Sequence, residues 1–312
     1  MGKRVLVTGS SGMLGSFLCP KLREQSWVGE LITPDHHACD LRDLQAVNKL
    51  FIQERPDIII HLAGNVGGIG YARTHPGSFF YDNAVMGINV LEAARLANVE
   101  KFVGMGSVCS YPEFAPIPLQ EETLWDGYPQ EVNAPYGIAK KALLVMSQAY
   151  RQQYNFNAIH LLLVNLYGPG DKFDLERSHV IGALIRKFSD AVRDGAPAVT
   201  LWGDGSPTRE FLYVGDAAQA VLLATERYDE SDPVNIGSGQ EISIKDLAKL
   251  IALEVGFAGH IVWDSSKPNG QPRRCLNTRK AAELFAFHAR TPLKEGIART
   301  VAWFRENRER IA

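Results

Sequence analysis

The sequence predicts an α/β fold in which a doubly wound parallel sheet is joined to a smaller C-terminal α/β part. Short apolar runs alternate with longer amphipathic segments along the chain. The first apolar run, residues 3–8, leads into a glycine-rich turn at residues 9–15. No internal repeat, low-complexity tract or linker separates the two halves. We therefore expect a dinucleotide-binding domain over residues 1–165, interleaved with a mainly substrate-binding domain over residues 166–312.

The N-terminal segment has the pattern of a strand, a glycine turn and a helix. The run KRVLVT is followed by GSSGMLG and by an amphipathic segment that extends to about residue 25. Small residues let the backbone approach a pyrophosphate, which then lies at the N-terminus of the helix. The glycine spacing is GxxGxxG, not GxGxxG. Because the turn connects the first strand to a helix, this position favours a Rossmann dinucleotide site over a plain tight turn.

The loop after the second expected strand, residues 30–33, leaves the choice of cofactor open. Asp35 lies about 20 residues beyond the glycines, where a ligand for the 2′-hydroxyl of NAD is expected. His36 and His37 could instead contact the 2′-phosphate of NADP. Asp40 is also well placed to cap a short turn, which would give this loop an ordinary structural role.

The third and fourth expected strands, residues 57–63 and 101–106, lie on either side of a glycine-rich loop and a long helix. We expect residues 64–70 to lack regular structure, either approaching a ligand or acting as a connector, and residues 76–98 to be helical. The fourth strand ends in MGSVCSYP, which contains Ser107 and Cys109. The carboxyl ends of parallel strands are where such sheets bind ligands.

The segment YGIAK begins an expected helix over residues 136–154. Tyr136 and Lys140 are four residues apart and so share one helical face. A nearby ammonium group favours phenolate, so we expect Lys140 to lower the pKa of Tyr136 and make it a usable proton donor or acceptor. Together with Ser107, this pair predicts an active site.

The rest of the chain continues the α/β pattern. An expected strand at residues 158–164 leads into the loop NLYGPGD, and His179 stands at the start of a helix that reaches about residue 192. Strands follow at 199–202, 209–214 and 234–236, helices at 216–227 and 243–255, and two terminal helices after a basic loop at 267–274. Trp202 and Arg209 flank a turn, and an anionic ligand that contains a ring would suit them.

The bulk composition and charge do not point to a particular function. The chain has 312 residues, of which 46% are apolar and 22% charged, as in ordinary globular proteins. A formal net charge of −2 gives no general reason to expect a nucleic acid or a membrane as partner. Four widely spaced cysteines without a CxxC pair favour free thiols over disulfides or a metal site. With no secretory leader and no apolar run near the roughly 20 residues that cross a bilayer, we expect a cytoplasmic protein.

The motifs as a set resemble the extended short-chain dehydrogenase/reductase (NAD-dependent epimerase/dehydratase) family, and within it the GDP-L-fucose synthase group. TGxxGxxG and YxxxK mark only the superfamily, whereas the cysteine of GSVCSYP and the SHVI that follows NLYGPGDKF are more selective. The resemblance extends almost from end to end, through TGSSGMLGS, NVGGIG, GSVCSYP, APYGIAKK, NLYGPGDKF, SHVIGALIRKF, LWGDGSPTREFLYV, PVNIGSG and KPNGQPRR.

The resemblance implies an oxidoreductase that is also an isomerase, inverting C3 and C5 of a GDP-linked 4-keto-6-deoxyhexose and then reducing C4 with hydride. It assigns Cys109 as the base and His179 as the acid of the epimerisation. Tyr136 would donate a proton during reduction, Lys140 would hold the cofactor ribose, and Ser107 would bind the C4 oxygen.

The resemblance also implies the binding residues. The expected cofactor is NADP(H), with NAD(H) as the alternative, and family members commonly form homodimers through the two long helices, residues 76–98 and 136–154. The substrate-binding positions are Lys187, Trp202, Arg209 and Asn269. The cofactor-binding positions are Gly9, Ser10, Ser11, Gly12, Met13, Leu14, Gly15, His36, Asp40, Leu41, Met105, Gly106, Lys140, Asn165, Leu166 and His179.

Several departures from the family pattern keep other functions open. Ser10, Ser11 and the loop of Asp35, His36 and His37 stand where many members carry arginines that secure NADPH, and Gly182 replaces a common proline beside the substrate. The alternatives are a nucleotide-sugar epimerase of the GDP-mannose 3,5-epimerase type and a reductase of another 4-keto sugar nucleotide. A dinucleotide-sensing module without catalytic activity is the non-enzyme alternative.

Overall fold

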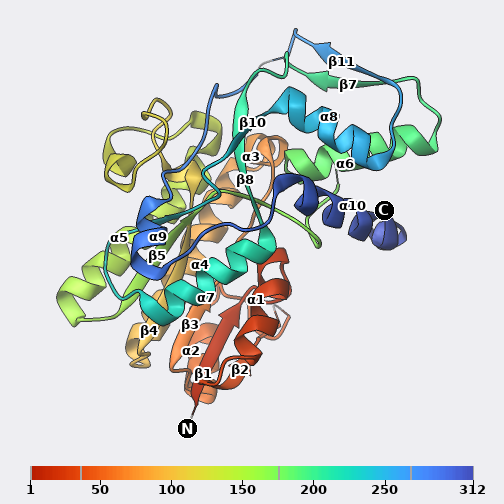
Figure 1. Ribbon diagram of the computed structural model, residues 1–312. Coiled ribbons are helices and arrows are strands. Elements are labelled where there is room, and N and C mark those ends of the chain that lie inside the picture. Colours follow the sequence, from red (N-terminus) through yellow and green to blue (C-terminus); the bar gives the residue numbers. More distant parts are fainter. Residues whose placement is uncertain (1, 36, 175, 268, 312) are drawn as a thin grey trace.

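The main body of the protein is a parallel sheet with helices on both faces (Figure 1). The computed structural model describes residues 2–35, 37–174, 176–267 and 269–311. The six strands are ordered β2-β1-β3-β4-β5-β9. Their bounds are β1 Lys3–Thr8, β2 Val28–Ile32, β3 Ile58–His61, β4 Lys101–Ser107, β5 Ala158–Leu163 and β9 Val234–Ile236. This arrangement confirms the predicted fold class.

The order of the strands fixes where a ligand can bind. The chain moves outward from β1 to β2, then crosses to β3 on the other side of β1. In open α/β sheets, ligands bind beyond the carboxyl ends of the strands, at the point where this reversal occurs. The glycine turn that follows β1 and the loop that follows β3 therefore lie beside the expected binding crevice.

Successive side chains of a strand point to opposite faces of the sheet, so both faces carry apolar side chains. A separate group of helices covers each face. Leu6 packs toward α2, α4 and α5, whereas Val5 and Val7 pack toward α1 and α7. All seven residues of β4 are buried, as expected for a central strand covered on both faces. The helices of this part are α1 Met13–Arg23, α2 Leu44–Glu54, α3 Ile69–Thr74, α4 Pro76–Leu96, α5 Ala134–Tyr154, α7 Val214–Arg227 and α9 Arg279–Phe285. Short 3₁₀ helices occur at η1 Val108–Ser110, η2 Glu121–Trp125 and η3 Glu131–Asn133.

The smaller part, at the upper right of Figure 1, has its own sheets and its own core. Its three-stranded sheet has the order β10-β8-β6, and β11 pairs with β7. Phe173, Phe188 and Phe304 are among its fully buried side chains. Its elements are β6 Asn165–Tyr167, α6 Val180–Arg193, β7 Ala198–Trp202, β8 Thr208–Tyr213, β10 Glu241–Ser243, α8 Ile244–Val255, β11 His260–Asp264 and α10 Leu293–Ile311. Between these elements, α7 and β9 return to the main sheet.

The structure differs from the sequence-based expectations in a few short elements. β6 lies in a segment expected to be a loop, β10 was not expected, and α3 begins at Ile69 inside the glycine-rich segment. Strands of three residues are too short to show a period of two, so tertiary pairing decides them. In the described part of the chain, no helix is both long and apolar enough to span a membrane.

Candidate active site

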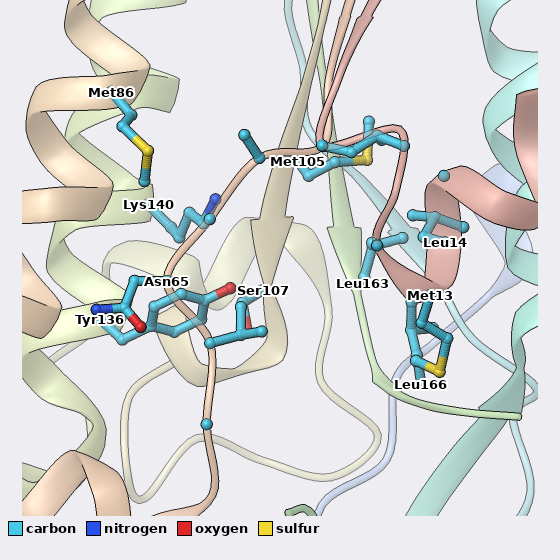
Figure 2. Close-up of a pocket in the computed structure, with 18 of the residues that line it drawn as sticks. Met13, Leu14, Asn65, Met86, Met105, Ser107, Tyr136, Lys140, Leu163 and Leu166 are labelled. Atoms are coloured by element: carbon cyan, nitrogen blue, oxygen red, sulfur yellow. The ribbon is translucent and has the colours of Figure 1, made fainter. Parts of the chain in front are cut away.

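A cavity of about 800 Å³ opens beyond the carboxyl ends of β1, β3, β4 and β5. Its lining includes Asp40, Tyr136 and His179. In Figure 2, Lys140, Tyr136 and Ser107 lie on one side of this cavity, and Met13, Leu14 and Leu166 lie on the opposite side. The cavity thus joins the glycine turn to the strand end that carries the expected catalytic residues.

The glycine turn can hold a pyrophosphate. Gly9 has φ of +69°, and a Cβ atom added there would lie 2.7 Å from the backbone nitrogen of Ala63, so the turn needs glycine at this position. Gly12 precedes α1 with extended backbone and no side-chain cap, and the first turn of α1 contains no acidic residue. The amide protons at this helix N-terminus remain available to an anion. These residues therefore fit the diphosphate of a dinucleotide.

The cavity lining includes a basic residue, Arg42, that the sequence analysis did not select. Asp40 accepts a hydrogen bond from the backbone N–H of Arg42 at 2.9 Å and pairs with its guanidinium at 2.8 Å. Arg42 also reaches Asp82 at 3.3 Å, and the bonds from Arg42 lower the pKa of Asp40 to about 2. All three side chains line the cavity. The sequence could have indicated Arg42, because this basic residue lies a few positions beyond the loop that was expected to contact the cofactor ribose.

Most of the expected cofactor residues line this cavity, with two exceptions. Ser10 is not part of the lining, although Ser11 is. His36 lies outside the described residues. The expected residues that do line the cavity are Gly9, Ser11, Gly12, Met13, Leu14, Gly15, Asp40, Leu41, Met105, Gly106, Lys140, Asn165, Leu166 and His179.

Ser107, Tyr136 and Lys140 come together at the end of β4. Figure 2 shows the hydroxyl of Tyr136 directed toward Ser107. The Tyr136 ring stacks on Phe79 with 5.0 Å between centroids, and Lys140 Nζ lies 5.7 Å from the Tyr136 ring centroid. Packing against Phe79 thus fixes the phenol so that its oxygen faces the serine at the strand end.

The expected lowering of the Tyr136 pKa is wrong in direction. Burial raises the pKa of Tyr136 above its usual value of 10, and burial lowers the pKa of Lys140 to about 8. Both groups are deeply enclosed, and loss of hydration disfavours the charged form of each; the charge of Cys109 is the second cause that raises the pKa of Tyr136. Tyr136 is therefore a protonated phenol at neutral pH, which is the form that a proton donor requires.

Close backbone packing brings Cys109 beside Tyr136. A Cβ atom on Gly137 would lie 2.3 Å from the carbonyl oxygen of Cys109, so α5 can approach η1 this closely only with glycine there. The hydroxyl of Ser110 donates to the carbonyl of Gly137 at 3.0 Å, and the Cys109 N–H donates to Ser107 Oγ at 3.1 Å. The half-buried Cys109 therefore faces the same cavity as Ser107 and Tyr136.

His179 faces the cavity from the start of α6. It precedes the helix with extended backbone, and its carbonyl accepts the first intrahelical bond from Ala183. Burial, followed by the charge of Lys172, lowers the pKa of His179. The structure brings Cys109 and His179 into the lining of one cavity although they are distant in sequence.

Asp171 and Lys172 are further cavity residues that the sequence analysis did not select. Asp171 Oδ1 accepts from the backbone N–H of Lys172 at 2.7 Å, while Oδ2 is buried without a hydrogen-bond partner among the described residues. Burial raises the pKa of Asp171 to about 7. Lys172 Nζ donates to the carbonyl of Val66 at 2.9 Å and so ties this loop to the glycine-rich loop after β3. In the sequence, only the motif NLYGPGDKF, which contains both Asp171 and Lys172, pointed to these residues.

We expect Asp171→Asn to stabilise the protein at alkaline but much less at acidic pH. The folded-state pKa of about 7 exceeds the usual 3.8, so the wild type loses stability as pH rises between these values, whereas asparagine does not ionise. At 1.36 kcal/mol per pKa unit, the gain should be about 2–3 kcal/mol larger at pH 8 than at pH 5. Urea unfolding at both pH values measures it, and an equal gain at both would contradict the ionisation argument.

The four expected substrate residues lie outside the lining of this cavity. Trp202 is 64% exposed, and Asn269 Oδ1 accepts from the backbone N–H of Asp204 at 2.9 Å in the turn beside it. Lys187 is half-buried on α6. Arg209 donates to the carbonyl of Thr208 at 2.7 Å, and burial, followed by the charge of Arg274, lowers its pKa to about 10.

This chain is similar to a family model, to a relative of known sequence and to solved structures. A model of the NAD dependent epimerase/dehydratase family matches residues 5–237. The GDP-L-fucose synthase of Sinorhizobium fredii is 41% identical over 306 residues, covering 98% of this chain and 96% of that protein. Among solved structures, a GDP-L-fucose synthetase of Naegleria fowleri bound to NADP matches with a TM-score of 0.89 and 30% identity, covering 98% and 95% of the two chains. A GDP-6-OMe-4-keto-L-xylo-heptose reductase of Campylobacter jejuni matches with a TM-score of 0.92 and 28% identity over 98% of each chain.

Proposed function

The chain belongs to the NAD dependent epimerase/dehydratase family, and from this premise we propose that it is an NADP(H)-dependent epimerase-reductase of the GDP-L-fucose synthase type. It inverts C3 and C5 of a GDP-linked 4-keto-6-deoxyhexose and then reduces the C4 ketone. One observation carries this proposal: Ser107, Cys109, Tyr136 and His179 line the same cavity as the glycine turn.

The cofactor is NADP(H), as in the related enzyme of Naegleria fowleri. When bound, it supplies the hydride that reduces the ketone. The amide protons around Gly12 at the start of α1 hold its diphosphate. Arg42 would take the role of the family arginines toward the 2′-phosphate, because it is a guanidinium that lines the cavity beside Asp40.

Epimerisation uses Cys109 and His179, two groups that an enzyme catalysing only reduction would not need. The ketone acidifies the hydrogens on C3 and C5, so Cys109 removes a proton from one face of the sugar and His179 supplies one to the opposite face. Ser107 and Tyr136 donate hydrogen bonds to the C4 oxygen and stabilise the enolate between these steps. The lowered pKa of His179 makes its protonated form a stronger acid, although less of the residue is protonated at neutral pH.

Reduction uses the same oxygen-binding pair. Tyr136 gives its phenolic proton to the C4 oxygen as that oxygen gains negative charge, and Ser107 keeps its hydrogen bond to it. Lys140, which is protonated below pH of about 8, would donate to the cofactor ribose and stabilise the phenolate that remains. One arrangement of donors thus serves both an enolate and an alkoxide.

The GDP moiety lies toward the C-terminal part, beyond the cavity of the cofactor. Arg209 is a guanidinium suited to a diphosphate, with Lys187 as a second cation, and the exposed indole of Trp202 offers a flat surface to guanine. Asn269 fixes the turn that carries Trp202. On this proposal residues 166–312 mainly bind the substrate. The exposed Tyr81 and Val145 on the adjacent α4 and α5 support a homodimer through these helices.

The decisive experiment offers GDP-4-keto-6-deoxy-D-mannose with NADPH and, separately, with NADH. Cofactor oxidation is followed by absorbance, and NMR determines the product configuration. We expect oxidation of NADPH with inversion at C3 and C5. Reduction without inversion would identify a plain 4-keto reductase, as the name of the Campylobacter jejuni relative suggests for that protein. No oxidation with any 4-keto sugar nucleotide would refute the proposal.

A further inference from the structure

A guanidinium group lies directly against the sulfur of Cys109. Arg274 Nη1 donates to Cys109 Sγ at 3.7 Å, although 165 residues separate the two in sequence. Arg274 belongs to the segment between β11 and α9, which returns from the smaller part of the molecule to the end of β4. This contact is the only side-chain hydrogen bond to that sulfur among the described residues.

The guanidinium is held in place by a chain of hydrogen bonds. The buried Gln271 donates from Nε2 to the carbonyl of Glu113 at 2.8 Å, and its Oε1 accepts from Arg274 Nη2. The carbonyl of Arg274 accepts from the backbone N–H of Glu210 at 3.1 Å, which fixes this segment to β8. Both the backbone and the side chain of Arg274 are therefore oriented independently of any substrate.

The positive charge near the sulfur is not neutralised by an ion pair. Within the described ranges of the chain, no carboxylate lies within salt-bridge distance of Arg274, and the neighbouring Arg273 pairs instead with Glu241. The buried carboxylate of Glu210 accepts from the backbone N–H groups of Leu276 and Gly239, at 2.6 and 2.7 Å. Arg274 therefore has its charge available for Cys109.

We propose that Arg274 is the positioning residue for Cys109: it holds the sulfur toward the substrate and stabilises the thiolate that removes the proton during epimerisation. This inference rests on the proposed function. In each inversion the thiolate takes the proton and becomes a thiol, and the electron pair of the C–H bond moves into the enolate. The enolate then takes a proton from His179 on the other face, and solvent restores the protonation of both side chains.

A competing role for Arg274 would be to bind the diphosphate of the substrate. The two roles predict different kinetics. A phosphate ligand that binds ground state and transition state alike changes mainly KM, whereas a residue that stabilises the thiolate changes the rate of proton removal at saturating substrate. The rate of C4 reduction also distinguishes these two roles of Arg274, because reduction does not need the thiolate.

The test measures deuterium exchange from D₂O into C3 and C5 of GDP-4-keto-6-deoxy-D-mannose at saturating concentration, without cofactor turnover. Arg274→Gln should slow this exchange by about 10- to 100-fold, the range expected for losing a hydrogen bond to a charged group. Arg274→Lys should recover most of it, and added guanidinium ion should partly rescue Arg274→Gln. Arg273→Gln, a neighbouring change at an exposed ion pair, is the matched control and should exchange at the wild-type rate.

Alkylation of Cys109 provides a second readout that needs no substrate. The other three cysteines are buried, so iodoacetamide reacts mainly with Cys109, and its rate at pH 7.5 should fall in Arg274→Gln. A wild-type alkylation rate together with a higher KM and an unchanged maximal exchange rate would overturn the inference and assign Arg274 to the substrate. No exchange in the wild-type enzyme would instead show that the proposed epimerase function fails. Circular dichroism confirms that each variant is folded.

Discussion

Replacing Tyr136 by phenylalanine is expected to slow C4 reduction by about 10²- to 10⁴-fold, the usual contribution of a positioned acid. The change removes only the hydroxyl, and the ring should stay stacked on Phe79. Burial raises the pKa of the native phenol and so favours its protonated form, which in the proposed mechanism delivers its proton to the C4 oxygen. Exchange at C3 and C5 should decrease less, because Ser107 still donates a hydrogen bond to the enolate oxygen.

The measurement is a single-turnover assay of NADPH oxidation beside deuterium exchange on the same preparation. Tyr150→Phe is the matched control, because Tyr150 lies on the same helix but bonds to Glu92 and does not line the cavity. Unchanged reduction in Tyr136→Phe would require another acid. An equal loss of reduction and exchange would mean that Tyr136 acts mainly by shaping the site.

Much of the candidate site around Ser107 and Tyr136 could be predicted from the sequence, because local sequence patterns determine where its residues lie. Ser107 and Cys109 follow a continuous apolar run, so they had to lie at a strand end, and Tyr136 and Lys140 share a helical face by their spacing alone. The GxxGxxG turn lies between strand and helix as expected. These features depend on neighbours within a few residues, which is the range over which sequence patterns are reliable.

The parts that could not be predicted depend on packing between distant segments. The direction of the Tyr136 pKa shift follows from how completely the site is enclosed, which the helical spacing does not report. Arg42, in the turn before α2, contacts Asp82 on α4, and Arg274 reaches Cys109 from the segment between β11 and α9. Gly137 matters only because the backbone of η1 passes against it. Tertiary proximity of this kind leaves no periodic signal in the sequence.

Replacing Cys109 by serine is expected to separate the two halves of the reaction. Serine keeps the size of the side chain and the backbone N–H that donates to Ser107, so the oxygen-binding pair should remain in place. At neutral pH a serine hydroxyl ionises far less than a thiol, so it provides far less of the anion that would act as the base. Exchange at C3 and C5 should therefore fall by about 10²- to 10⁴-fold, while NADPH-dependent reduction at C4 continues at a measurable rate on the unepimerised sugar.

The product of Cys109→Ser makes this prediction sharper than a rate alone. Hydride delivered to the unepimerised ketone should give a sugar that keeps the substrate configuration at C3 and C5, which NMR distinguishes from the wild-type product. Cys19→Ser, which replaces a buried thiol outside the cavity, is the control for general effects of losing a thiol. If Cys109→Ser abolished reduction as completely as exchange while remaining folded, Cys109 would be part of the common binding site and not a dedicated base. If exchange persisted at the wild-type rate, the base would have to be sought elsewhere in the cavity, with the buried carboxyl of Asp171 as the next group to test.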